Sequence, residues 1–159
     1  MKITRHGEKV AEINPIKTGE AAPDFSLTDL SGNTITLSKL SKPVLISTFP
    51  DINTRVCSLQ TQRFNVEASK HEGIDFLSIS NNTKEEQKNW CAAEGVDMTI
   101  LSDDGQFSKA YGIFLESTQR LARTIFVLKD GKVLYSEIVT ELTDEPDYSK
   151  ALEAAEKAE

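Results

Sequence analysis

A short and almost entirely apolar run, "PVLISTF" (43–49), limits the folds that this chain can adopt. A segment with the pattern of a helix follows it directly. An apolar run of strand length without polar alternation is typical of a strand that is buried on both faces. Such a strand needs a covering layer on each side. The run therefore indicates an inner strand of a layered α/β sheet.

The residues after this strand have helical spacing over 54–70. Val56, Leu59, Arg63 and Val66 fall on one face at i, i+3, i+7 and i+10, with Arg63 as the polar exception. The pattern predicts a helix that begins directly behind the apolar strand.

The remainder of the chain continues to alternate between strand and helix patterns. Thr83 is the expected N-cap of a helix, Glu86 completes a capping box, and Gly95 stands just past the end. Asp130-Gly131 is the turn of the clearest hairpin. The elements predicted after the first helix are a strand (73–80), a helix (83–95), a short strand (98–102), a short helix (107–113), a hairpin (123–139) and a closing helix (146–158).

Two short hairpins are expected before the apolar run. The first 13 residues alternate weakly around Gly7, and a loop with two prolines follows. Residues 25–40 read as strand, Gly32-Asn33 turn and strand. The candidate inward residues of this second hairpin are Phe25, Leu27, Ile35 and Leu37.

The element order β-α-β-α-β-β-α predicts an α/β fold, with a mixed central sheet flanked by helices. It is the order of the thioredoxin fold carrying an insertion. A length of 159 residues suits one domain, and no linker or repeat divides the chain. We expect a single thioredoxin-like domain over 1–159, in which residues 1–20 form an N-terminal β-hairpin extension.

The charge balance limits the classes of partner. The net charge is −7, and the acidic residues are spread along the chain, which argues against binding to nucleic acid or to an anionic membrane. The N-terminus has no apolar segment typical of a secretory signal. No apolar run approaches the roughly 20 residues that cross a bilayer. A cytoplasmic location is the default expectation.

Cys57 and Cys91 are the two cysteines of the chain. His6 and His71 show no ligand-like spacing to them, so no zinc site is expected. A purely structural disulfide is unusual in a reducing cytosol. The two residues are therefore either inert thiols or a redox pair.

Cys57 stands where the apolar strand passes into the helix. If Thr54 is the N-cap, Cys57 is in the first turn, where unpaired N–H groups and the helix dipole favour a thiolate. The Thr54 hydroxyl and the Arg55 guanidinium are near in sequence. Arg123, at the start of a later strand, is a remote candidate that the fold could bring to the same edge. The alternative is that Cys57 and Cys91 serve only in packing.

The stretch "PDINTRVCSLQTQRFN" (50–65) resembles a known family. Pro50, Thr54 and Cys57 reproduce the P-x-x-x-T-x-x-C signature of the peroxiredoxins. The continuation Gln60-Thr61 and Arg63-Phe64-Asn65 is similar to the thiol peroxidase subgroup. Further matches are "APDFSL" (22–27), "QKNWCAAEG" (87–95), "LSD" (101–103), "LARTIFVL" (121–128) and the final "EPDY" (145–148).

The resemblance implies a role for each site residue. Cys57 would attack the peroxide O–O bond and become a sulfenic acid, and Cys91 of the same chain would condense with it to a disulfide. Thr54 and Arg123 would hold the peroxide and the thiolate, and Pro50 would shield the pocket. The substrates would be hydrogen peroxide and organic hydroperoxides, as in an antioxidant peroxidase.

The resemblance also implies the partners. Thioredoxin would reduce the disulfide, so that neither a metal nor an organic cofactor is needed. Members of the family are typically homodimers. A dithiol–disulfide exchange enzyme of the same fold would normally carry C-x-x-C, which is missing here. A redox sensor that keeps the fold is the other alternative.

The chain departs from the family at two places. Asp51-Ile52-Asn53 stands where the family usually has Ser-Ile-Asp. Asp51 disfavours the thiolate if the two groups are close, and loss of the acid at Asn53 acts in the opposite direction. Thr83–Glu86 replaces an apolar Leu-Pro-Phe-Ala segment, which bears on the family's preference for bulky or lipid hydroperoxides.

A disulfide between Cys57 and Cys91 sets a mechanical requirement. Its two Cα atoms must lie within about 7 Å of each other. Two cysteines on separate helices are not expected to meet this limit in the reduced fold. We therefore predict local unwinding around 54–60 and 85–95 during turnover.

Overall fold

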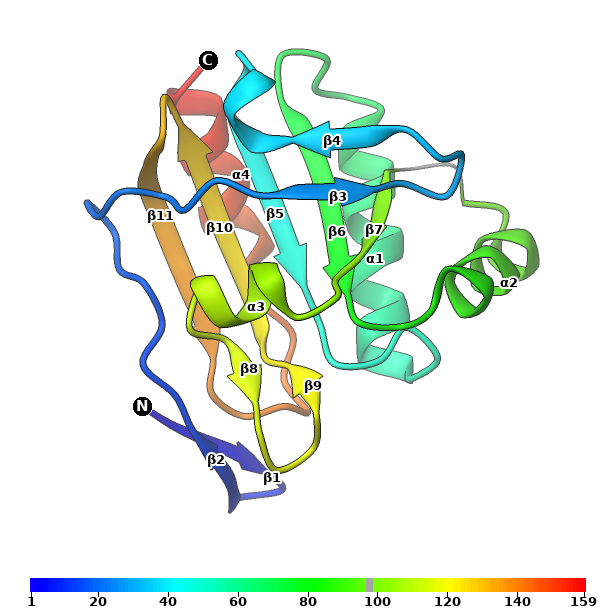
Figure 1. Cartoon of the computed structure of the whole chain (residues 1–159), viewed down its shortest axis with the longest axis vertical. Coiled ribbons are helices and arrows are strands. Elements are labelled where there is room, and N and C mark those ends of the chain that lie inside the picture. The colour runs from blue at the N-terminus through cyan, green and yellow to red at the C-terminus, as the bar shows by residue number, and fades with distance from the viewer. Residues whose placement is uncertain (97–98) are drawn as a thin grey trace.

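The computed structural model describes residues 1–96 and 99–159, and a central mixed sheet in the order β11-β10-β5-β6-β7 organises them (Figure 1). Strands β5, β6 and β7 are parallel, whereas β10 runs antiparallel to both β5 and β11. The strands are β5 (Val44–Thr48), β6 (Asp75–Ser80), β7 (Ile100–Ser102), β10 (Arg123–Lys129) and β11 (Lys132–Val139).

Strand β5 is buried along its whole length, as its apolar run predicts. Its side chains alternate between two hydrophobic clusters. Leu45 packs in one cluster with Ile125, and Ile46 packs in the other with Phe126. The strand therefore holds together two layers of the molecule.

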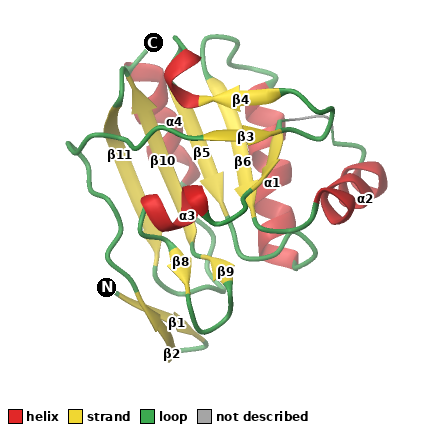
Figure 2. Cartoon of the chain, in the orientation of Figure 1, coloured by secondary structure: helices red, strands yellow, loops and turns green. Residues whose placement is uncertain are grey.

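Helices cover both faces of the sheet, as predicted. Helices α1 (Arg55–Ala68) and α4 (Tyr148–Lys157) lie behind it, and α3 (Gln106–Ala110) lies in front (Figure 2). Phe64 of α1 joins the rear cluster, whereas Phe107 of α3 joins the front one. Helix α2 (Lys84–Glu94) stands to one side, beyond β6 and β7.

Helix α1 buries a different face from the apolar one in its sequence. Leu59 and Val66 are exposed by 41% and 49%. The buried residues of the helix are Cys57, Gln60, Thr61 and Phe64. Two of these residues are polar and can be buried because they are hydrogen-bonded: Gln60 donates to Ser47 and Thr48 of β5, and the Thr61 hydroxyl donates to the Cys57 carbonyl in the same helix. A pattern of apolar residues alone does not reveal such a face.

Helix α2 confirms its predicted ends. The Thr83 side chain accepts from the Glu86 backbone, the Glu86 carboxylate accepts from Thr83, and Gly95 is left-handed with φ 66°. Of the short strand predicted at 98–102, the structure has Ile100–Ser102; Met98 lies outside the described residues.

The predicted hairpins are present. Strands β1 (Lys2–Arg5) and β2 (Glu8–Glu12) form the N-terminal one, and β3 (Ser26–Thr28) and β4 (Thr34–Thr36) cross the front of the sheet (Figure 1). The short 3₁₀ helix η1 (Leu37–Lys39) and the small ribbon of β8 (Phe114–Leu115) and β9 (Arg120–Leu121) have no counterpart in the sequence prediction.

The N-terminal hairpin is fastened to the end of β11. The Thr4 N–H donates to Thr140 at 2.7 Å, and the Leu142 N–H donates to Thr4 at 2.8 Å. This attachment holds Arg5 at a pocket that Cys57 of α1 also lines. Within the described residues, no helix is long and apolar enough to span a bilayer.

Candidate active site

The sheet register brings Cys57 and Arg123 to the same edge. Thr124 of β10 pairs with Thr48, the last residue of β5, so Arg123 lies beside the loop that leads from β5 into α1. The Thr48 hydroxyl donates to the Ala122 carbonyl at 2.9 Å and fixes this crossing. Residues distant in sequence therefore meet where α1 begins.

Cys57 and Arg123 form a buried pair. Thr54 is the N-cap of α1, so Cys57 is its third helical residue, near unpaired backbone N–H groups. Arg123 Nη1 donates to Cys57 Sγ at 3.4 Å. The residues are 1% and 2% exposed, respectively, so the sulfur and the guanidinium interact with little competition from water.

Arg123 is held in place by uncharged partners. Its Nη1 also donates to Gln60 Oε1 and its Nη2 to the Leu142 carbonyl, both at 2.8 Å. Gln60 Nε2 in turn donates to Ser47 Oγ at 2.6 Å and to the Thr48 carbonyl at 3.1 Å. None of these acceptors is a carboxylate, so among the described residues no hydrogen-bonded or ion-paired anion competes with the sulfur for the charge of Arg123.

Thr54 differs from the sequence expectation in one respect. It occupies the N-cap position, but its side chain accepts no hydrogen bond from the helix. Its hydroxyl instead donates to the Asp51 carbonyl at 2.7 Å, within the tight turn that precedes α1. Pro50 is buried in the same turn. Thr54 therefore shapes the loop, and its oxygen keeps its acceptor capacity.

Pro50, Thr54, Cys57 and Arg123 line one pocket of about 450 Å³. The structure thus brings together four of the five residues that the sequence predicts for the site. Leu142 lines the pocket as well and links it to the N-terminal hairpin.

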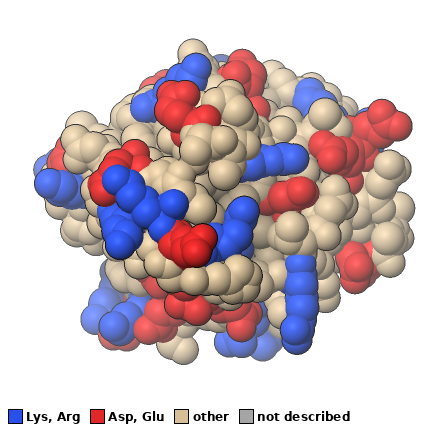
Figure 3. Space-filling model, turned by 90° about the horizontal axis from the view of Figure 1, so that it is seen from below, with Lys and Arg blue, Asp and Glu red and all other residues tan. Residues whose placement is uncertain are grey.

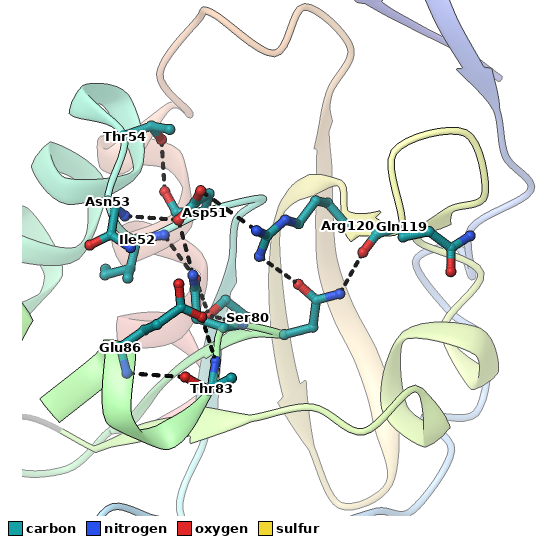
Figure 4. Close-up of polar contacts among 11 residues, drawn as sticks. Asp51, Ile52, Asn53, Thr54, Ser80, Thr83, Glu86, Gln119 and Arg120 are labelled. Atoms are coloured by element: carbon teal, nitrogen blue, oxygen red, sulfur yellow. Dashed lines mark hydrogen bonds and ion pairs between the residues drawn. The ribbon is translucent and has the colours of Figure 1, made fainter.

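Asp51 also lines this pocket and is the centre of a polar network (Figure 4). Its Oδ1 accepts from Asn82 Nδ2 at 2.9 Å and from the Asn53 N–H at 3.0 Å, and its Oδ2 lies 3.7 Å from Arg120 Nη2. Burial alone would raise the pKa of Asp51, but these hydrogen bonds and the Arg120 charge outweigh it and lower the pKa. The carboxylate is therefore paired, and this offsets its repulsion of a nearby thiolate.

Asn82 extends the network to α2. Its Oδ1 accepts from the Ile52 N–H and from Ser80 Oγ, both at 2.9 Å. Thr83, the next residue, caps α2. The loop before Cys57 is therefore tied directly to the start of the helix that carries Cys91.

Cys91 is the predicted site residue that does not line the pocket around Cys57. It is half-buried on α2, packs against the small cluster that contains Cys57, and lines a different pocket. Neither cysteine is in a disulfide. Trp90 Nε1 donates to Ser58 Oγ at 3.0 Å, so contacts between the neighbours of both cysteines hold α1 and α2 in their present positions.

Sequence reasoning missed two polar residues of the site. Gln60 is three positions after Cys57, a spacing that places both on one helix face, and this could have identified it. Arg120 offered no local signal, because its partners Asp51 and Asn81 are far away in sequence. Among the described residues, no group of three His, Cys, Asp or Glu side chains could hold a metal ion.

Comparisons with known proteins identify relatives of this chain. A family model described as Redoxin matches residues 17–152. The thiol peroxidase of Staphylococcus saprophyticus is 49% identical over 144 residues, 87% of each chain. That of Halalkalibacterium halodurans is 44% identical over 151 residues, 91% of this chain and 90% of the relative.

A solved structure confirms the predicted thioredoxin-like fold. The peroxiredoxin-like protein from Aquifex aeolicus superposes with a TM-score of 0.90 at 25% identity, covering 99% of this chain and 97% of the other. The chain therefore belongs to the Redoxin family and, within it, to the thiol peroxidase subgroup of the peroxiredoxins.

Proposed function

We propose that this protein is a thiol-dependent peroxidase that reduces hydroperoxides with Cys57 as the nucleophile. The observation that carries the proposal is the hydrogen bond from the buried Arg123 guanidinium to Cys57 Sγ in the first turn of α1. Cations and helix N-termini favour the thiolate, which is the reactive form of cysteine. The named activity of the relatives supports the same conclusion.

The first step is a two-electron transfer from sulfur to the peroxide. The thiolate attacks the terminal oxygen of ROOH, the S–O bond forms as the O–O bond breaks, and RO⁻ takes up a proton to leave as an alcohol, or as water when the substrate is H₂O₂. Cys57 becomes a sulfenic acid. Arg123 stabilises the charge on sulfur and, through its unpartnered Nε–H, the charge that develops on oxygen.

Thr54 and Pro50 complete the proposed reaction site. The Thr54 proton is engaged by the Asp51 carbonyl, so the hydroxyl oxygen can accept the O–H of the incoming peroxide. Pro50 lines the pocket and has no N–H that would compete with the peroxide for an acceptor. Both residues therefore position the substrate.

The second half of the cycle uses Cys91. Its thiol displaces hydroxide from the Cys57 sulfenic acid, which gives a disulfide and water. The dithiol of thioredoxin then reduces this disulfide by exchange. We propose that the protein acts as a homodimer in the cytoplasm. Sedimentation equilibrium tests the dimer, and a molecular mass that stays monomeric at micromolar concentration contradicts it.

Stopped-flow consumption of H₂O₂ tests the nucleophile. Reduced wild type is expected to react far faster than free cysteine, and Cys57→Ser is expected not to react. Cys91→Ser should complete the first turnover but lose recycling by thioredoxin. The proposal is lost if wild type reacts no faster than free cysteine. If Cys91→Ser is recycled by thioredoxin as fully as wild type, Cys91 serves only in packing.

A further inference from the structure

The pocket above Cys57 is strongly basic, although the protein is acidic. The charged residues that line it are four arginines (Arg5, Arg55, Arg120 and Arg123) and one acid, Asp51. The chain as a whole has a net charge of −7. Figure 3 views this end of the molecule from below, and several basic side chains gather near its middle with acidic ones among them.

These arginines are only partly neutralised. Among the described residues, Arg120 forms an ion pair with Asp51 alone, through Oδ2 at 3.7 Å, and Asp51 Oδ1 already accepts from Asn82 and Asn53. Arg120 also donates to Asn81 Oδ1 at 3.3 Å, which is uncharged. Arg5 and Arg55 are exposed, and neither forms an ion pair with any described residue.

The same pocket has buried donors without a partner. Over the described part of the chain, three buried side-chain atoms lack a hydrogen bond, and two of them, Thr118 Oγ1 and Arg123 Nε, belong to residues that line this pocket. A buried polar atom without a partner is costly. An acceptor oxygen of a ligand that reaches either atom would remove this cost.

We propose that the site selects hydroperoxides that carry a carboxylate, and that Arg120 is the residue that determines this specificity. The proposal rests on the proposed function and names the substrate class of that same site. Guanidinium groups bind carboxylates through two parallel hydrogen bonds. Arg120, with Arg55 and Arg5 near it, would hold the carboxylate, while the O–OH group reaches Cys57 and Arg123. The carboxylate is unchanged by the reaction.

A matched pair of substrates tests the proposal. A short alkyl hydroperoxide with a terminal carboxylate and its methyl ester share the reacting group and nearly the same size. Reduced protein is mixed with each, and the loss of the Cys57 thiol is followed by rapid quenching and mass spectrometry. We expect wild type to react with the acid at least tenfold faster than with the ester. A ratio of one or below overturns the proposal.

Variants assign the preference to residues. Arg120→Gln should lower the acid-to-ester ratio several-fold, and Arg120→Lys should restore part of it because the charge returns without the fork of donors. Arg55→Gln removes an exposed charge that forms no side-chain hydrogen bond or ion pair with the described residues, and it should lower the ratio as well. In the control Arg63→Gln, an exposed cation outside the pocket is lost, and the ratio should stay at the wild-type value.

The proposed substrate specificity and the proposed peroxidase function can be rejected independently. If H₂O₂ oxidises Cys57 rapidly but the acid has no advantage over the ester, only the specificity is wrong. If H₂O₂ does not oxidise Cys57, the peroxidase function itself is lost. An acid preference that persists in both Arg120→Gln and Arg55→Gln contradicts the role assigned to these arginines.

Discussion

Gln60 is the residue that determines how Arg123 faces Cys57. It is completely buried, accepts from Arg123 Nη1, and is itself fixed by donating to Ser47 and Thr48. An amide at this position anchors the guanidinium without neutralising it. A carboxylate would anchor it equally well but would add a negative charge near the sulfur.

We predict that Gln60→Glu lowers the rate of Cys57 oxidation by H₂O₂ at pH 7 about tenfold, equivalent to roughly 1.4 kcal/mol in the barrier. Gln60→Ala should lose both rate and about 1–3 kcal/mol of stability, because it leaves buried groups unpaired. Stopped-flow kinetics and urea unfolding measure the two effects. Gln106→Ala, an exposed change on α3, is the control. An unchanged rate in Gln60→Glu would mean that the charge of Arg123 has no influence on the sulfur.

Asp51 gives a prediction on pH. Its folded-state pKa is lowered, so the ionised form stabilises the fold at pH values above the ordinary pKa of about 4, and this stabilisation is lost as the pH falls through the lowered value. Wild type should exceed Asp51→Asn by about 1 kcal/mol in unfolding free energy at pH 7. The difference should shrink in acid. Urea unfolding at pH 7, 5 and 3 measures it, with the exposed Asp144→Asn as control. A difference that is equally large at pH 3 contradicts the assignment.

Among the helices and strands, local signals predicted most boundaries to within about two residues, although the short helix predicted over 107–113 is Gln106–Ala110. Thr83, Glu86 and Gly95 fix both ends of α2 through bonds within a few residues, and Asp130-Gly131 fixes the turn between β10 and β11. Such chemistry is visible in one short stretch of sequence.

The buried face of α1 and the residues around the pocket could not be predicted in this way. Gln60 is buried because Arg123, 63 positions later, bonds to it, and Asp51 is paired because Arg120 reaches it from β9. Their environment is created by tertiary contacts alone. Arg123 could be predicted, because it stands at the start of a strand and because the family resemblance implies its role.

Helices α1 and α2 are the elements that we expect to change conformation when the protein is oxidised. Cys57 is in the first turn of α1, and Cys91 is near the end of α2. Hydrogen bonds from Trp90 to Ser58 and from Gln62 to Glu94 hold the two helices against each other. A disulfide needs Cα atoms within about 7 Å. We expect oxidation to break these contacts and to unwind 54–60 and 85–95.

Amide hydrogen exchange of the reduced and oxidised protein tests this unwinding. Both segments should exchange at least tenfold faster after oxidation, which corresponds to a loss of about 1.4 kcal/mol in opening free energy. The hairpin of β10 and β11 should be unaffected, and Cys91→Ser, which cannot form the disulfide, should show no such increase. Trp90, the only tryptophan of the chain, offers a fluorescence signal for the same event. Equal protection in both redox states would contradict the prediction.

In the molecule as a whole, the described residues form three hydrophobic clusters around the sheet. The front cluster contains Phe107, the rear one contains Phe64, and a smaller one contains Trp90 beside Cys57. Strand β5 contributes side chains to both large clusters, and the loop that follows it contributes to the third. The shared strand couples the two large clusters, because neither can be lost without exposing a face of β5, and the loop after β5 joins the third cluster to them.

This coupling predicts that residues 1–159 unfold as a single domain. Phe107→Ala and Phe64→Ala remove large buried rings from opposite faces of the sheet, and each should cost about 3–5 kcal/mol. In a cooperative unit, either change shifts every probe equally. Urea transitions followed by far-UV circular dichroism and by Trp90 fluorescence should therefore coincide in wild type and in both variants. The exposed Leu134→Ala, with an expected effect within about 0.5 kcal/mol, is the control. If the Trp90 transition separates from the circular dichroism transition in either variant, the cluster around Cys57 unfolds independently and the chain is not one cooperative domain.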